Sequence, residues 1–165
     1  MTDTNPFWQF SLALYAETGV ADACMALQDG VGIDVNLLLY CAWCAHSGAA
    51  LEESDIAEMD ALVADWRAEA VLPARALRRR LRDYAGVEPT RDAIKQAELE
   101  AERHQQGLMW RASESLASTL PAAAALEGNL KALASFMQEP EAALDTFRRL
   151  TQSLFDEGWR PPTVQ

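Results

Sequence analysis

Alanine and leucine dominate this chain, while valine and isoleucine are scarce. The 165 residues include 30 alanines and 21 leucines but only 10 valines and isoleucines together. Alanine and leucine lose little side-chain freedom in a helix, whereas β-branched residues are restricted there and favour strands. Because 50% of the residues are hydrophobic, the chain also has enough apolar side chains for a core. We therefore expect an all-α protein.

Residues that start and stop helices divide the chain into segments. Asn5, Asp34 and Ser54 are expected N-caps, and Pro73 and Pro140 suit the first turn of a helix. The expected helices cover residues 6–17, 20–28, 35–46, 55–71, 73–85, a polar segment from 90, 122–137 and a last segment from 140. This pattern predicts a compact bundle of about seven to eight helices.

The segment 35–46 has apolar side chains on all sides of a helical wheel. A helix of this kind needs neighbours all round, so we expect it to be the central helix. The length suits a single helical domain over residues 1–165. Gly107 is expected to break the polar helix, and the alternative for residues 107–165 is a helical hairpin extension that ends in a short extended tail.

The negative charge is concentrated in the N-terminal part of the chain. The net charge is −11, and residues 1–66 hold 11 acidic residues and no lysine or arginine. Such a surface repels nucleic acid, whose binding depends on neutralising phosphates. We expect no nucleic-acid partner. Two interpretations of the acidity stay open, since it either keeps the protein soluble or selects a basic partner.

The sequence also bears on the compartment. The longest apolar run, 35–45, is too short to span a bilayer, and the N-terminus lacks the positive charge of a signal peptide. Three cysteines form no disulfide framework and suit a reducing compartment. We expect a cytoplasmic protein that does not enter a membrane.

Two clusters resemble chemical sites in composition only. In a helix His46 faces away from Cys41 and Cys44, and that cysteine pair lies in a helix interior rather than at the helix start where thiols are activated. Glu98 and Glu102 lack the Glu-x-x-His spacing of di-metal bundles and are interpreted as part of a solvated face. We expect no metal, no cofactor and no catalytic residue.

Four arginines form one face of the segment 73–85. Arg75, Arg78, Arg79 and Arg82, here called the Arg face, are expected on the exposed side of a helix that docks through Leu77, Leu81 and Tyr84. Neighbouring guanidinium groups repel one another unless acids or anions face them. Two roles stay open: pairing with the chain's own acids, among them Glu98 and Glu102, or binding an acidic partner or a phosphate-bearing ligand.

Asn36 is the polar member of the apolar segment 35–46. A buried amide needs hydrogen-bond partners, so Asn36 is interpreted either as a structural lock or as a site residue. In the second case Asn36, Tyr40 and Trp43 are the candidate residues of a pocket.

Several strings resemble a family of small, uncharacterised proteobacterial proteins, defined as a domain of unknown function. They are Phe7-Trp8-Gln9-Phe10-Ser11-Leu12, Leu14-Tyr15, Gly19-Val20, Leu27-Gln28-Asp29, Gly32 with Asp34-Val35-Asn36-Leu37-Leu38-Leu39-Tyr40, Trp66-Arg67 and Leu77-Arg78-Arg79-Arg80-Leu81. The resemblance covers roughly residues 6–105. It implies a helical bacterial protein of the cytosol and assigns no activity to any residue.

Two functions follow as hypotheses. The first is a non-catalytic interaction or regulatory module that acts through protein–protein contacts, because catalytic motifs are missing while the acidic part and the Arg face offer contact surfaces. A protein partner is then expected, and a homodimer is compatible with this hypothesis. The second is a small-molecule-binding protein or an enzyme with a helical pocket near Asn36, Tyr40 and Trp43.

Overall fold

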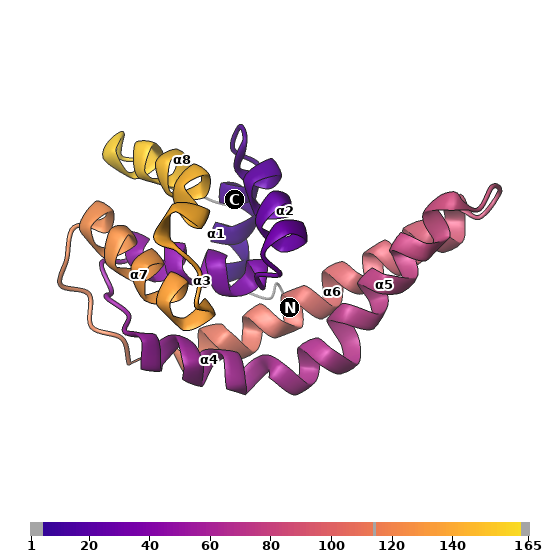
Figure 1. Ribbon diagram of the computed structural model, residues 1–165, viewed down its shortest axis with the longest axis horizontal. Helices are drawn as coiled ribbons and strands as arrows, with labels where there is room; N and C mark the ends of the chain where they lie inside the picture. Colours follow the sequence, from indigo (N-terminus) through magenta and orange to yellow (C-terminus); the bar gives the residue numbers. More distant parts are fainter. Residues whose placement is uncertain (1–4, 114, 163–165) are drawn as a thin grey trace.

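The computed structural model describes residues 5–113 and 115–162, and within these ranges the chain is helical without named strands (Figure 1). The all-α expectation is therefore confirmed. The elements are α1 (Pro6–Tyr15), α2 (Val20–Gly30), α3 (Val35–His46), α4 (Glu53–Trp66), the π-helical turn η1 (Arg67–Val71), α5 (Leu72–Arg80), the 3₁₀ turn η2 (Leu81–Asp83), α6 (Glu88–Ala112), α7 (Ala122–Met137), the 3₁₀ turn η3 (Glu141–Leu144) and α8 (Asp145–Asp156).

Helix α3 is the centre of the fold, as its apolar pattern predicts. Asp34 caps its first turn by accepting a hydrogen bond from the Asn36 amide at 2.8 Å. Side chains on every side of α3 are buried, and between Leu37 and Ala45 only Trp43 is partly exposed. Helix α7 packs along α3, and α1, α2, α4 and α6 also contact it. A fully apolar helix of this kind is stable in water only when neighbours cover it all round.

A buried amide fastens α7 to the chain that follows α3. Asn129 Nδ2 donates to the carbonyl oxygens of Cys41 at 3.1 Å and Ala49 at 3.0 Å, and its Oδ1 accepts from the Leu51 amide at 2.7 Å. All these groups are buried, so each hydrogen bond satisfies a backbone group that water does not reach. Asn129 therefore fixes the loop between α3 and α4.

Helices α4 and α5 form one curved rod rather than two separate helices (Figure 1). The Leu72 amide donates to the Arg67 carbonyl, five residues earlier, so the chain passes through a π-helical turn between them. Pro73 lies in the first turn of α5, where its missing amide donor costs little. The sequence predicts a boundary between two helices at Pro73, but the rod only changes locally from α-helix to π-helix just before this residue.

Several predicted helix boundaries differ from those of the structure. Helix α2 continues through Gly30, and Glu52 with Asp55 forms the capping box of α4 in place of a Ser54 cap. Helix α6 begins at Glu88 and runs unbroken past Gly107 to Ala112. Gly107 is buried inside this helix, so its low helix propensity is outweighed by packing.

The part of the chain that projects from the body is the α5–α6 hairpin, which consists of α5, η2 and the first half of α6 (Figure 1). Gly86, with φ of 79°, lies in its turn. In the segment after Gly107, for which the sequence leaves a helical hairpin extension open, Leu126, Leu130 and Leu133 of α7 belong to the same core cluster as α3. Because α7 packs in this core, the projecting α5–α6 hairpin lies in the middle of the chain and not at its end.

Helix α8 and the segment after it close the other side of the body. Helix α8 packs on α2 and α7. Trp159 Nε1 donates to Glu17 at 2.6 Å, and the Trp159 ring packs against Phe10 and His46. The C-terminal segment thereby covers the ends of α1 and α3.

Among the described residues, no single helix is long and apolar enough to cross a membrane. Helices α1 and α2 reach the required length only as a pair, and the two are bent by 98° relative to each other.

Candidate functional site

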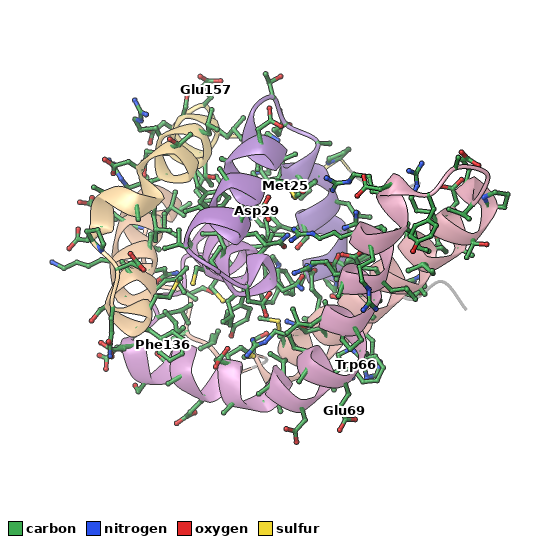
Figure 2. The ribbon with its side chains drawn as sticks, turned by 45° about the vertical axis from the view of Figure 1, so that its right-hand side comes forward. Met25, Asp29, Trp66, Glu69, Phe136 and Glu157 are labelled. Atoms are coloured by element: carbon green, nitrogen blue, oxygen red, sulfur yellow. The ribbon has the colours of Figure 1, made fainter. Side chains whose placement is uncertain are left out.

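Arg75 and Arg78 of the Arg face line a cleft between the α5–α6 hairpin and the body. Its volume is about 690 Å³. Five helices supply its lining: Trp8, Ser11, Leu12 and Tyr15 of α1; Met25 and Gln28 of α2; Val35, Asn36 and Leu39 of α3; Arg75 and Arg78 of α5; and Asp92, Lys95, Gln96, Glu98, Leu99, Glu102 and Gln106 of α6. Met25 and the neighbouring Asp29 mark its α2 side in Figure 2.

Two members of the Arg face, Arg75 and Arg78, lie against α6 on the lining of the cleft. Arg75 Nε donates to Glu98 at 3.0 Å and its Nη2 donates to Glu102 at 2.7 Å. Arg78 donates to both carboxylate oxygens of Glu98. The Arg75 side chain is only 14% exposed and that of Glu98 only 8%. Arg75 and Arg78 thus pair with carboxylates of the same chain, which is the first of the two roles that the sequence left open.

The predicted orientation of α5 is wrong. Leu77 is 39% exposed and Tyr84 65% exposed, while Leu81 is only partly buried. These residues do not dock the helix. The interpretation of Glu98 and Glu102 as a solvated face is wrong as well, because Glu98 is buried. Charge-assisted hydrogen bonds at this interface replace the apolar contact that the helical wheel predicted.

Arg79 and Arg82, the other two members of the Arg face, are more exposed than Arg75 and Arg78. Arg79 Nη2 lies 2.7 Å from Asp29, so this ion pair connects α5 with α2. Both of its side chains are substantially exposed, and such pairs contribute only about 0–1 kcal/mol. Arg82 is exposed, and no ion pair joins it to another of the described residues.

Burial and neighbouring charges shift the pKa values of Glu98 and Glu102 in opposite directions. Burial raises the pKa of Glu98, but hydrogen bonds and charges from Arg78 and Arg75 outweigh it and hold the pKa below its usual range. Burial also raises the pKa of Glu102, and Arg75 only partly opposes this effect, so its pKa lies above the usual range. Glu98 is thus a fixed anion, and Glu102 is the more easily protonated neighbour.

The polar floor of the cleft joins α3 to α6. Gln106 Nε2 donates to Asn36 Oδ1 at 2.8 Å, and both residues are buried. Next to this pair, Asp34 accepts from Gln105 Nε2 at 2.7 Å and from Arg67 at 2.9 Å. Asp34 therefore serves both as the expected cap of α3 and as a junction with η1 and α6.

Two buried polar atoms on the cleft lining have no hydrogen-bond partner among the described residues. They are the Ser11 hydroxyl oxygen and the Gln106 amide oxygen, on residues that are 3% and 1% exposed. An unpaired buried polar group costs about 1–3 kcal/mol. The residues that line the cleft thus include two whose polar atoms are unsatisfied but lie beneath its surface.

Of the three pocket residues expected from the sequence, the structure places only Asn36 on the cleft. Tyr40 and Trp43 lie instead in an aromatic cluster with Phe7, with ring centroids 5.8 Å and 5.2 Å from the Phe7 ring. Tyr40 is 2% exposed. These two rings support the wall behind the cleft rather than line it.

Sequence reasoning missed Ser11 and Gln106, whereas it named Glu98 and Glu102 among the acids that could pair with the Arg face. Ser11 and Gln106 carry no motif, and only tertiary contact brings them to the same surface. Glu98 and Glu102 did carry a signal, because their i, i+4 spacing matches the i, i+3 spacing of Arg75 and Arg78 on the neighbouring helix. That match is visible only once α5 and α6 are paired.

The cysteines lie away from the cleft. Cys24, Cys41 and Cys44 are free and buried. Burial raises the pKa of Cys24 and of Cys44 to about 12. In the part of the chain that the structure describes, no three His, Cys, Asp or Glu residues are grouped to hold a metal ion.

Comparison with known proteins gives one match. The sequence model of a family described as "Protein of unknown function (DUF2390)" matches residues 6–109. No curated protein and no solved structure matches the chain. The matched range contains every residue that lines the cleft, together with α1 to α5 and nearly all of α6. On this match over more than half of its length, the chain belongs to the DUF2390 family of proteins of unknown function.

Proposed function

We propose that this protein binds a small organic molecule, without transforming it, in the cleft between the α5–α6 hairpin and the body. The observation that carries the proposal is a cleft lined by five helices, in which the ion pair of Arg75 and Glu98 lies beside apolar side chains. Its volume of about 690 Å³ falls in the range of roughly 300–1,000 Å³ typical of ligand pockets. Apolar lining residues such as Trp8, Leu39 and Leu99 support the same proposal.

Binding is favoured over catalysis by the state of the carboxylates. Both oxygens of Glu98 accept hydrogen bonds from Arg75 and Arg78. A carboxylate held in this way is a poor general base, because a proton on it breaks its ion pairs. The geometry therefore supports a fixed binding surface.

Leu12 and Leu62 allow a matched test. Leu12 lines the cleft and is 50% exposed, whereas Leu62 lies outside it and is 48% exposed. Leu12→Glu places a charge on the cleft wall, and Leu62→Glu places the same charge on an unrelated surface. Because both side chains are exposed, we expect both variants to fold.

The measurement is native mass spectrometry of protein purified from its own host. We expect a bound low-mass species on the wild type and on Leu62→Glu, and its loss from Leu12→Glu. A spectrum in which all three proteins carry no bound species contradicts the proposal, as does a species that Leu12→Glu retains.

A second candidate function is the protein-interaction module expected from the sequence. It is favoured by the outward side chains of the α5–α6 hairpin, since Leu72 is 47% exposed and Tyr84 65% exposed. Exposed apolar side chains on a projecting element are typical of contact surfaces. The candidate predicts a stoichiometric protein partner, or a homodimer, that Leu72→Ser with Tyr84→Ser abolishes while the melting temperature is unchanged. Sedimentation of the purified protein with and without the partner is the test.

The proposal places the protein in the cytoplasm of a bacterium. The three free, buried cysteines support a reducing compartment. Fractionation of the host cells checks this location.

A further inference from the structure

Two guanidinium groups lie side by side on the lining of the cleft. Arg75 Nε and Arg78 Nη2 donate to the same carboxylate oxygen of Glu98, at 3.0 Å and 3.2 Å. Glu98 is buried and both of its oxygens are engaged, so it anchors the two groups at this place. Guanidinium groups are planar forks of N–H donors, a geometry that matches carboxylates and phosphates.

Each guanidinium group keeps donors for a further partner. The Nη1 atoms of Arg75 and Arg78 form no hydrogen bond with any of the described residues. Neither atom belongs to the buried polar atoms that lack a partner, so both are in contact with solvent. These N–H groups are therefore free to donate to a molecule in the cleft without loss of the ion pairs with Glu98 and Glu102.

Acceptors that lack a partner are fewer at this place. Among the carboxylate oxygens of Glu98 and Glu102, only Glu102 Oε2 accepts no hydrogen bond from a described residue. The remaining charged residues of the lining, Asp92 and Lys95, are exposed and opposite in sign, so water and salt screen their fields. A cationic head group meets like charges on two guanidinium groups here, whereas an anionic one meets unused donors.

The remaining acceptor belongs to a carboxyl group that is easily protonated. Burial raises the pKa of Glu102 above its usual range, and Arg75 only partly opposes this effect. The charged or titratable groups that act on this carboxyl group are Arg75 and Arg78 of α5, Tyr15 of α1, Asp34 before α3 and Glu98 of α6. A bound anion adds a negative charge beside Glu102 and raises its pKa again, so a proton from solvent relieves the repulsion.

The same cleft offers an apolar surface. Leu12 of α1, Met25 of α2 and Leu99 of α6 line it, and all three are large hydrophobic side chains that the protein leaves exposed. An apolar body that covers them removes their surface from water, which favours binding. The lining thus combines unused charged donors with an apolar surface.

We infer that the cleft selects an amphipathic oxyanion, whose carboxylate or phosphate head accepts hydrogen bonds from Arg75 Nη1 and Arg78 Nη1 while its apolar body covers the exposed apolar side chains of the lining. Its binding is accompanied by the uptake of a proton at Glu102. This inference rests on the proposed function and adds the class of ligand to it.

Probes of equal chain length test the head group: octanoate, octyl phosphate, octanamide and octylamine. Each is titrated at about pH 7 into the full-length protein, and binding is followed by the chemical shift of the Trp8 indole, which lies on the lining. We expect the better of the two anions to bind at least about tenfold more tightly than octanamide and octylamine, because charge-assisted hydrogen bonds are about twice as strong as neutral ones. The better anion identifies the head group as a carboxylate or a phosphate. Equal or tighter binding of octanamide or octylamine overturns the inference, and so does a failure of both anions to bind.

Two glutamates of α6 give matched variants. Glu102→Gln removes the carboxylate that repels a bound anion, and Glu100→Gln removes the same charge from an exposed residue that is not on the lining of the cleft. Both substitutions keep the shape of the side chain, so we expect both variants to fold. Glu102→Gln should bind octanoate severalfold more tightly than the wild type at about pH 7.5, and Glu100→Gln should bind it as the wild type does. Equal octanoate affinity in Glu102→Gln and wild type overturns the role of Glu102.

The pH dependence of octanoate binding is an independent measurement. In the wild type the affinity should rise as the pH falls from about 7.5 to about 6, a range in which octanoate stays ionised. The cause is the proton that Glu102 takes up, so the affinity of Glu102→Gln should not change with pH. The histidines are the same in both proteins. A rise that Glu102→Gln retains, or no rise in the wild type, therefore overturns the coupling to Glu102.

The two proposals fail in different ways. If neither anion binds, the inferred class is wrong whatever the native mass spectrum shows. The proposed function falls only when the wild-type protein from its host also carries no molecule that Leu12→Glu displaces. A retained molecule without an acidic head group keeps the proposed function and overturns the inferred class.

Discussion

Asn36 and Gln106 are 70 residues apart in the chain and share a buried hydrogen bond of 2.8 Å. This bond ties the first turn of α3 to α6 and forms part of the cleft floor. The two interpretations that the sequence left open for Asn36, a structural lock and a site residue, are therefore compatible. Its amide holds the fold together and also fixes the direction in which the Gln106 carbonyl is presented.

Arg75 is expected to stabilise the fold, in contrast to Arg82 of the same Arg face. Arg75→Gln leaves Glu98, whose side chain is 8% exposed, with one fewer cationic partner. We expect a loss of about 2–3 kcal/mol in the free energy of unfolding, because a buried carboxylate that loses a partner keeps its desolvation cost. Urea denaturation followed by circular dichroism measures it.

Arg82→Gln is the control for Arg75→Gln, because Arg82 is exposed and has no ion pair with another described residue. It should change stability by less than about 0.5 kcal/mol. Equal effects of the two substitutions would mean that the Arg75–Glu98 contact does not stabilise the folded state.

Asn129 is expected to be among the most sensitive polar residues of the body. Asn129→Ala removes three hydrogen bonds to buried backbone groups of Cys41, Ala49 and Leu51. We expect a loss of about 2–4 kcal/mol, since those groups stay buried without partners. Ser135 lies on the same helix as Asn129, and Ser135→Ala removes only an exposed hydrogen bond to Glu53 of α4. This substitution should cost less than about 0.5 kcal/mol. Thermal unfolding of both variants provides the comparison.

The three cysteines should be inert in the folded protein. The thiolate is the reactive form, and burial raises the pKa of Cys24 and Cys44 to about 12 and that of Cys41 well above its usual value. At about pH 8 iodoacetamide should label none of them in buffer and all of them in denaturant. Intact-mass measurement counts the labels, and rapid labelling in buffer would refute the buried placement of the thiols.

His46 should make the fold less stable in mild acid. Burial lowers the pKa of His46 below its usual value of 6.5. The unfolded chain therefore binds the proton more readily than the folded chain does, so stability falls as the pH drops through 6.5 towards the lower, folded-state pKa. We expect the free energy of unfolding to decrease between about pH 7.5 and about pH 5.5.

His46→Phe isolates this contribution. The ring keeps apolar contact with Phe10 and Phe155 but cannot take up a proton. The decrease in stability on acidification should therefore be smaller in this variant, while above about pH 7.5 the difference between variant and wild type should not depend on pH. An equally steep decrease in both proteins would assign the acid sensitivity to other groups.

Helix α5 shows why a helical wheel is insufficient for placing a surface. The wheel correctly separates the arginines from Leu77, Leu81 and Tyr84, since the angular spacing of side chains is a local property. It does not say which of the two faces meets the body. That choice depends on Glu98, 23 residues after Arg75, because only a carboxylate at that place makes a half-buried guanidinium favourable.

The sequence by itself determined the helical class, the caps at Asn5 and Asp34, and the central position of α3. Each of these depends on residues within a few turns: alanine and leucine favour helix, a side-chain oxygen caps the amides beside it, and a helix that is apolar all round needs to be covered. Only the tertiary structure decided the direction of α5 and the cleft that includes Ser11 and Gln106. Those features arise where segments distant in sequence meet, and the burial that makes an ion pair strong or a hydroxyl unsatisfied exists only after they have packed.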